Sequence, residues 1–371
     1  MAILQQRDPE VARGALEGWL ATKLDGASDI AIEVAGASEA SGFSSDTIIF
    51  DATYTQAGKQ RREGFVCRAA PFGEAVFEEY EIGLQYRVLD ALGRNSDVRV
   101  PNVRWLEEDP AVLGAPFIVM ERLHGKVPGD NPPYTLPPDW MPDANVDGWV
   151  LAATPEQQRR MWFEGIDQLV KIAKVDWRAI GLAELDRTEY GRLGQEQLFG
   201  YQRHYYEWAM RKRVPCLEYA WEWLAANKPD DDQLVGLSWG DSRLGNLMFD
   251  ADFNVLAVFD WEMVRIANPE YDFAWYLWFD HHFTDVVGLP KVAGFPSDDE
   301  SIAYWEDKMG RKAEHLEWYT VLTMAYFAAI MARVMISNMA HGGDVESTAP
   351  METNNTATQA LAKHFGLAPP E

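Results

Sequence analysis

Cysteine is nearly absent from this chain: Cys67 and Cys216 are the only two among 371 residues. Two isolated cysteines without a C-x-x-C motif exclude a disulfide framework. A reducing compartment is therefore expected, and the predicted location is cytoplasmic. The opening residues, MAILQQRDPE, lack a basic segment followed by an apolar run, so no signal peptide is expected.

Basic residues are also in deficit, with 33 Lys and Arg against 58 Asp and Glu and a net charge of −25. Such a chain repels nucleic-acid phosphates and anionic membranes, so neither is expected as a partner. A cationic substrate is compatible with this charge, although acidity can also serve solubility alone. The most apolar stretch, Trp318–Ala332, lies between two charged residues and is too short for a membrane span, which predicts a buried core helix.

Apolar residues make up 47% of the chain and 371 residues are enough for two lobes, so a large globular core is expected. Residues 8–23 predict a helix with Asp8 as N-cap and with Val11, Leu16, Trp19 and Leu20 on its apolar face. The remaining pattern predicts strands at 30–34, 47–54, 64–68, 98–106 and 116–121, a helix at 74–92, and further helices at 155–175, 189–213, 215–227, 270–282, 298–310, 314–341 and 356–365.

The most informative stretch is SWGDSRLGN at 238–246, followed by VFDWE at 258–262. Two apolar runs around a polar turn separate Asn246 from Asp260, which predicts a β-hairpin with these two residues side by side at its mouth. Asp241 lies on the loop just before them. Mg²⁺ prefers hard oxygen ligands and keeps several waters, so Asn246 and Asp260 are candidate metal ligands. The alternative is that all three are turn residues that satisfy backbone groups.

A catalytic-loop Asp, an Asn five residues later and an Asp after a hairpin form the kinase template for phosphoryl transfer. In that template Asp241 accepts the proton of the attacking hydroxyl or orients it, and Arg243 pairs with an acid or contacts the transferring phosphate. The sequence therefore predicts Asp241 and Arg243 as catalytic residues.

The motif resembles the aminoglycoside phosphotransferase and choline-kinase-like family of small-molecule kinases, whose loop commonly reads H-G-D-x-x-x-x-N before a hairpin and D-W-E. The R-L-G-N and D-W-E-M version here is most similar to the kinase-like domains joined to some acyl-CoA dehydrogenases, from about residue 30 to about residue 340. The resemblance implies an α+β, two-lobed protein-kinase-like fold. A small N-lobe (1–121) would hold an antiparallel sheet and one main helix, and a large, mostly helical C-lobe (122–371) would follow. Trp239 replaces the usual histidine as a packing support, and Asp272 is expected to stabilise the catalytic loop from a buried position.

The resemblance also implies a nucleotide site for ATP (or GTP) with Mg²⁺. Ser44 and Ser45 lie in the Gly/Ser-rich turn that would approach the phosphates. Arg68, at the end of the third strand, holds the place of the kinase lysine. The linker residues Met120, Glu121 and Arg122 would contact adenine, mainly through their backbone.

The acidic partner of Arg68 is where the chain departs from the family pattern. The pattern E-Y-R-V-L reads Gln85-Tyr-Arg-Val-Leu here, so the glutamate is a glutamine. Either Gln85 makes a neutral hydrogen bond to Arg68, or Glu81 or Glu78 substitutes from the preceding helical turns.

The predicted function is ATP- and Mg²⁺-dependent phosphorylation of a hydroxyl of a small molecule. An aminoglycoside, a macrolide, a sugar, an amino alcohol or a hydroxyacyl-CoA is an open choice of acceptor, with the R-L-G-N and D-W-E-M pattern favouring a metabolic substrate. The insertion at 124–150, rich in Pro, Gly, Asp and Asn, is predicted to be irregular and is a candidate lid. The alternative function is a nucleotide-binding pseudokinase or interaction protein, which Gln85 and Trp239 favour.

Overall fold

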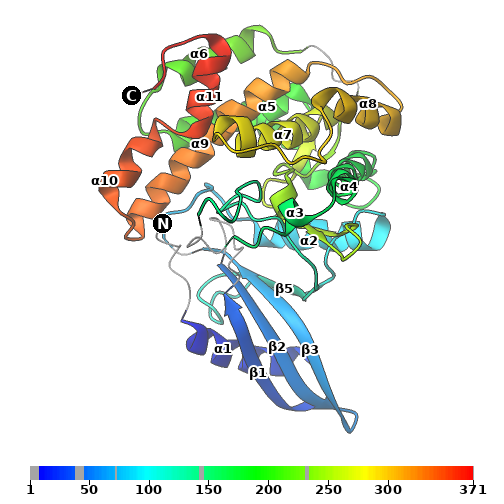
Figure 1. Ribbon diagram of the computed structural model, residues 1–371. Coiled ribbons are helices and arrows are strands. Elements are labelled where there is room, and N and C mark those ends of the chain that lie inside the picture. Colours follow the sequence, from blue (N-terminus) through cyan, green and yellow to red (C-terminus); the bar gives the residue numbers. More distant parts are fainter. Residues whose placement is uncertain (1–7, 38–45, 72, 142–145, 230–233, 371) are drawn as a thin grey trace.

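Two lobes of unequal size make up the computed structural model, which describes residues 8–37, 46–71, 73–141, 146–229 and 234–370 (Figure 1). The small lobe holds a five-stranded antiparallel sheet in the order β1-β2-β3-β5-β4. The large lobe is mostly helical. This arrangement confirms the predicted α+β, two-lobed fold. The strands of the sheet are β1 (Ala27–Ala37), β2 (Asp46–Gln56), β3 (Lys59–Ala69), β4 (Val103–Glu107) and β5 (Phe117–Glu121).

Helix α1 (Pro9–Lys23) begins as predicted, because the Asp8 carboxylate accepts hydrogen bonds from the backbone N–H groups of Glu10 and Val11. Its buried face consists of Ala12, Leu16, Trp19 and Leu20 and packs against one face of the sheet. The expectation for Val11 was wrong, since its side chain is 71% exposed.

Helix α2 (Ile82–Asn95) is shorter than the predicted helix over 74–92, because residues 74–81 do not form helix. Their polar groups are bonded to the large lobe instead. The Tyr205 hydroxyl donates to the Val76 carbonyl at 2.8 Å, and the Ser337 hydroxyl donates to the Glu74 carbonyl at 2.7 Å. These tertiary bonds outweigh the helical pattern of the segment.

Helices in the large lobe follow the predicted order, with boundaries that differ by a few residues. The long ones are α4 (Pro155–Ala173), α5 (Gln195–Ala209), α6 (Pro215–Ala226), α7 (Pro269–His281), α8 (Asp298–Met309), α9 (Leu316–Ala340) and α11 (Thr356–Phe365). The sequence did not predict the short helices α3 (Trp149–Ala152) and α10 (Val345–Thr348). Two small sheets pair β6 (Gly236–Ser238) with β9 (Arg265–Ala267), and β7 (Leu247–Phe249) with β8 (Val255–Val258).

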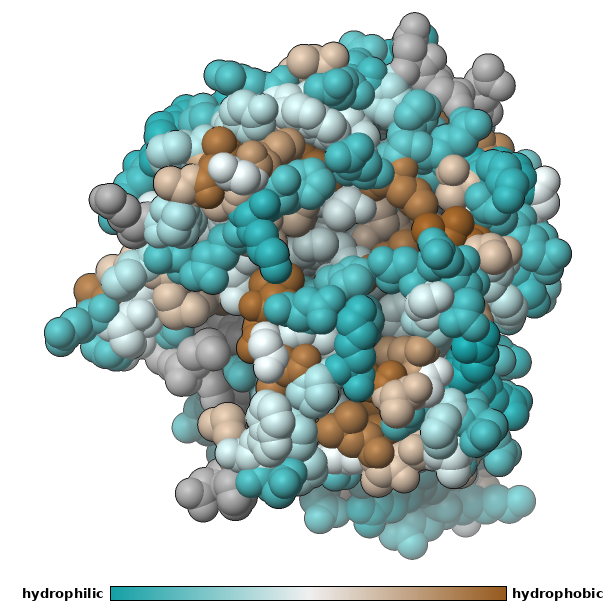
Figure 2. Space-filling model, turned by 45° about the horizontal axis from the view of Figure 1, so that its top comes forward, coloured by the Kyte–Doolittle hydropathy of each residue, from teal (hydrophilic) through white to brown (hydrophobic). Residues whose placement is uncertain are grey.

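Helix α9 is long and apolar enough to cross a membrane by length and composition, so the expectation that this stretch is too short was wrong. However, 83% of its most apolar 18-residue window is buried inside the protein. It is thus the buried core helix that the sequence predicted. On the face drawn in Figure 2, hydrophilic side chains predominate and apolar residues form separate patches.

Candidate active site

The catalytic loop runs from β6 to β7 and includes a 3₁₀ turn at Leu244–Asn246. The hairpin β7–β8 then returns the chain, and the Phe259 N–H donates to the Asn246 carbonyl at 2.9 Å. Asn246 and Asp260 therefore lie side by side at the mouth of the hairpin, which confirms the geometry expected from the sequence.

Asp241 is surrounded by donors from three directions. Arg243 Nε lies 3.0 Å from each of its carboxylate oxygens, Asn246 Nδ2 donates to Oδ2 at 2.7 Å, and Trp275 Nε1 donates to Oδ1 at 3.1 Å. Burial, together with the nearby charge of Asp260, raises the pKa of Asp241 to about 7. A carboxyl group tuned to this range can accept a proton near neutral pH.

Trp239 supports the turn at Phe259–Asp260 and is fully buried. Its indole N–H donates to the carbonyls of Phe259 at 2.7 Å and Asp260 at 3.1 Å. Asp260 itself has a left-handed backbone with φ of 60°, an unfavourable conformation for a residue other than glycine. The tryptophan in place of histidine therefore fixes this turn through packing and one N–H donor that two carbonyls share, as expected.

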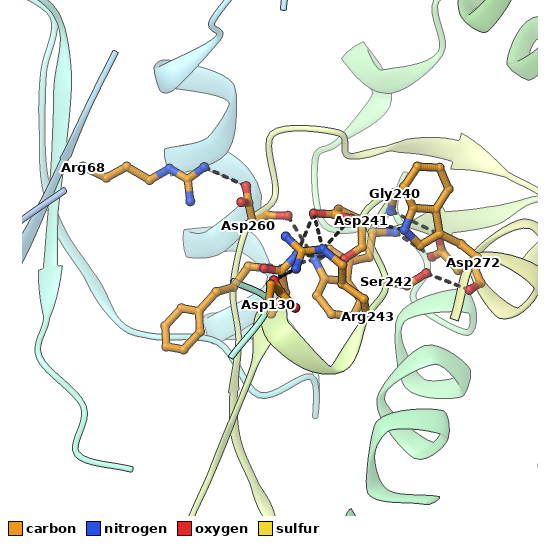
Figure 3. Close-up of polar contacts among 12 residues, drawn as sticks. Arg68, Asp130, Gly240, Asp241, Ser242, Arg243, Asp260 and Asp272 are labelled. Atoms are coloured by element: carbon orange, nitrogen blue, oxygen red, sulfur yellow. Dashed lines mark hydrogen bonds and ion pairs between the residues drawn. The ribbon is translucent and has the colours of Figure 1, made fainter. Parts of the chain in front are cut away.

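Asp272, in the first turn of α7, holds the start of the catalytic loop (Figure 3). Its buried carboxylate accepts hydrogen bonds from Ser238 Oγ at 2.7 Å and from the backbone N–H groups of Trp239 at 2.7 Å and Gly240 at 3.0 Å. The Ser242 hydroxyl donates to its carbonyl at 2.7 Å. The predicted structural role of Asp272 is confirmed.

Arg68 reaches this cluster from β3, across the junction of the two lobes (Figure 3). Its Nη2 lies 2.6 Å from Asp260 Oδ1 and 3.0 Å from Glu262 Oε2. The three side chains are between 9% and 14% exposed, so solvent screens these ion pairs weakly. Glu262 was missed as a site residue, although its place in the D-W-E motif was visible in the sequence.

The predicted partners of Arg68 are placed elsewhere. Glu81 occupies the N-cap position of α2 without a side-chain capping bond and pairs with Arg187, and Glu78 lies before the helix, 2.9 Å from the ring of His204. Among the described residues the Gln85 side chain makes no hydrogen bond to Arg68 either. The expectation that one of these three residues pairs with Arg68 was therefore wrong, because the carboxylates after the hairpin already occupy its guanidinium.

The linker between the lobes keeps Met120 buried at the end of β5. The backbone N–H of Glu121 donates to Asn102 O and that of Arg122 donates to Gly64 O, each at 3.0 Å. These two donors belong to the sheet, so an adenine ring would have to meet neighbouring peptide groups. Ser44 and Ser45 lie outside the described residues, and their role stays a prediction.

In the described part of the insertion predicted at 124–150, residues 124–141 and 146–148 are irregular as expected, and α3 begins at Trp149. Asp130 forms an ion pair with Arg243 of the catalytic loop, beside the pair that Arg243 makes with Asp241. A Cβ atom at Gly245 would meet the Asp130 carboxylate, which would have to shift from its present position. Asp130 was also missed, because no motif marks a single Asp within a segment rich in Pro and Gly.

Two protein oxygen donors, the Asp260 carboxylate and the Asn246 amide oxygen, are available for a metal at the hairpin mouth. The amide nitrogen of Asn246 is committed to Asp241, which leaves its oxygen as the acceptor. No group of three or more His, Cys, Asp and Glu side chains in the described ranges could hold a metal. The pair fits Mg²⁺, which is usually held by one or two carboxylates together with substrate phosphates.

A cavity of about 150 Å³ lies beside the ion-paired cluster. Residues 77–81 and α2 form one wall, and α5, Trp261–Glu262 and β9 form the others. Gln85 and Glu262 both line it.

A two-lobed fold with these carboxylates at the lobe junction defines a protein of the kinase-like class. A family model described as the phosphotransferase enzyme family matches residues 40–304, which is more than half of the chain. The chain belongs to the phosphotransferase enzyme family.

Relatives and solved structures agree with this assignment. Acyl-CoA dehydrogenase family member 11 of Gallus gallus is 26% identical over 308 residues, covering 77% of this chain and 35% of that protein. The chain spans about a third of the length of the first curated relatives that it matches.

A Ralstonia eutropha protein assigned as an aminoglycoside phosphotransferase has the same fold, with a TM-score of 0.66 and 24% identity over 94% of this chain and 98% of that one. A thermostable mutant of the aminoglycoside phosphotransferase APH(4)-Ia, in a ternary complex with AMP-PNP and hygromycin B, gives a TM-score of 0.52 at 14% identity, over 95% and 99% of the two chains. The resemblance seen in the sequence is confirmed at the level of family and fold.

Proposed function

We propose that this protein is a kinase that transfers the γ-phosphoryl group of ATP (or GTP) to a hydroxyl of a small molecule. The observation that carries the proposal is the convergence of Asp241, Asn246, Asp260 and Arg68 at the lobe junction. Phosphoryl transfer needs chiefly positioning and charge neutralisation, and this set supplies both.

Asp241 accepts the proton of the acceptor hydroxyl, and Arg243 orients its carboxylate through the two 3.0 Å contacts. Asn246 and Asp260 would hold Mg²⁺, which would neutralise phosphate charge when bound. Arg68 adds a positive charge for the α- and β-phosphates, and its planar guanidinium can bind them in a bidentate manner.

The acceptor remains open among an aminoglycoside, a macrolide, a sugar, an amino alcohol and a hydroxyacyl-CoA. The similarity to part of acyl-CoA dehydrogenase family members favours a metabolic hydroxyl compound over an antibiotic. The net charge of −25 does not oppose a cationic acceptor. A cytoplasmic location belongs to this proposal and is supported by Cys67 and Cys216, which are both buried free thiols.

The experiment is ADP release from Mg·ATP across a panel of these five acceptor classes. Asp241→Asn and Asp260→Asn should each lower acceptor-dependent turnover by roughly 10²–10⁴-fold, because each removes a charge at the reacting centre. Asp252→Asn is the matched control, since Asp252 is exposed in the turn of the same hairpin.

A second candidate is a pseudokinase that binds nucleotide without transfer, which the missing contact between α2 and Arg68 favours. No turnover with any acceptor, together with ATP binding that is indifferent to Mg²⁺ and to Asp260→Asn, would establish that alternative.

A further inference from the structure

Arg68 pairs with carboxylates, and one of them has to stay paired with it when the other binds the metal. In protein kinases the basic residue of the third strand pairs with a glutamate on the following helix, and transfer requires that pair. Here two carboxylates contact Arg68, from Asp260 and Glu262. Because Asp260 is the carboxylate placed to bind Mg²⁺, Glu262 is the one whose charge is left for Arg68.

The helix has no acid to offer at this position. Gln85, which is 4% exposed, stands where the glutamate is expected, and no hydrogen bond of its side-chain amide is found within the described part of the chain. Gln85 on α2 and Glu262 after the hairpin line the same cavity. In this chain the carboxylate beside Arg68 therefore comes from the segment after the hairpin and not from the helix.

Glu262 is well fixed for this purpose. It follows Trp261, which is 2% exposed and whose indole N–H donates to the Val258 carbonyl at 3.0 Å. The Glu262 side chain is itself only 9% exposed. A carboxylate on so rigid a segment holds a guanidinium in one orientation at little further entropic cost.

We propose that Glu262 is the positioning residue for Arg68 and takes over the role that a helix glutamate has in protein kinases. This inference rests on the proposed function. One three-residue segment, Asp260–Glu262, then supplies both the metal ligand and the brace for the phosphate-binding arginine. Nucleotide binding consequently does not depend on an ion pair from α2.

The test is calorimetric measurement of Mg·ATP binding to the full chain without acceptor, for wild type, Glu262→Gln, Gln85→Glu and the double variant. Glu262→Gln should weaken ATP affinity about tenfold, as expected for loss of a charge-assisted bond, with an unchanged Mg²⁺ requirement. In that background Gln85→Glu should restore most of the affinity, whereas in wild type it should change little.

Glu352→Gln is the control for loss of a buried glutamate that pairs with an arginine, because Glu352 is 4% exposed and bonded to Arg211 away from the cavity. It should lower the melting temperature and leave ATP affinity unchanged. If Glu262→Gln does not fold, Glu262→Asp, which shortens the side chain by one carbon, should weaken binding and be rescued in the same way.

Three results would overturn the inference. The first is an unchanged ATP affinity in Glu262→Gln, and the second is a raised Mg²⁺ requirement in that variant, which would make Glu262 a metal ligand. The third is an equal effect of Gln85→Glu on ATP affinity in wild type and in Glu262→Gln. A wild-type protein that binds no Mg·ATP would instead overturn the proposed function, and the two failures are thereby distinguished.

Discussion

Two hydrophobic clusters of very different size build this protein. The small one joins α1 to one face of the sheet, and the large one fills the helical lobe and also includes Val88, Leu89 and Leu92 of α2. Strand β5 serves both, because alternate residues of a strand point to opposite faces. Phe117 and Val119 belong to the small cluster, whereas Ile118 and Met120 belong to the large one.

The two clusters show that α2 covers the second face of the sheet, where it packs against β4 and β5, and that this face is continuous with the large cluster. Arg87 forms two 2.7 Å bonds to Glu184, and Arg333 of α9 donates to Glu74 at 2.8 Å just before the helix. The boundary at residue 121 stays a prediction, but hydrophobic packing divides the chain differently. The proposed nucleotide site lies where the two lobes meet, with Arg68 from the sheet and with Asp260 and Glu262 from the segment that follows β8.

The largest expected loss of stability follows from removing the hydrogen bonds that join the catalytic loop to Asp272 of α7. Asp272→Ala leaves the Ser238 hydroxyl and two backbone N–H groups without their buried acceptor, which should cost about 4 kcal/mol of unfolding free energy. Denaturant titration measures the loss, and hydrogen exchange should rise at residues 236–240 but not in the sheet. Asp307→Ala, at an exposed position of α8, is the control. A loss below about 1 kcal/mol would contradict the account.

A matched pair of leucines tests the division into two clusters. Leu92 of α2 and Leu16 of α1 are both fully buried, so truncating either to alanine should cost about 3 kcal/mol. Native-state hydrogen exchange should show Leu92→Ala loosening α2 and its neighbours β4 and β5, and Leu16→Ala loosening α1 and β1. If Leu92→Ala loosened α1 and β1 instead, the two faces of the sheet would share one core and the comparison would fail.

The smallest expected effect lies at the C-terminal end of α7, where the His281 side chain is 30% exposed. His281 contacts Asp298 at 2.9 Å and Asp285 at 3.2 Å, and the hydrogen bond to Asp298 raises the pKa of His281 to about 9. A histidine whose pKa is raised on folding stabilises the protein fully below its unfolded pKa, near 6.5, and this contribution is lost as the pH rises through about 9.

His281→Gln should therefore cost about 1 kcal/mol at pH 6 and almost nothing at pH 10, as measured by denaturant titration. The exposed His124, replaced by Gln, serves as control and should show no such dependence. An equal loss at both pH values would mean that the imidazolium charge contributes nothing.

Local signals made much of the fold predictable. The Asp8 cap, the hairpin that joins Asn246 to Asp260 and the succession of helices in the large lobe all depend on residues close in sequence. The catalytic loop was predictable for the same reason, because Asp241 and Asn246 lie only five positions apart.

Contacts between distant residues were not predictable. Residues 74–81 have a helical pattern, yet their backbone is bonded to α5 and α9, more than a hundred residues away. Arg68 pairs with Glu262 and not with Gln85 or Glu81 because of how distant segments are arranged around the cavity. The docking of Asp130 on Arg243 likewise depends on the path of an irregular segment that has no periodic signal.

The contact between Asp130 and the glycine of R-L-G-N links two positions 115 residues apart in the chain. A side chain at 245 would push the Asp130 carboxylate from its position and weaken its ion pair with Arg243. The two positions should therefore covary across evolution: homologues that keep an acid at 130 should keep glycine at 245, and those with a larger residue at 245 should have lost the acid.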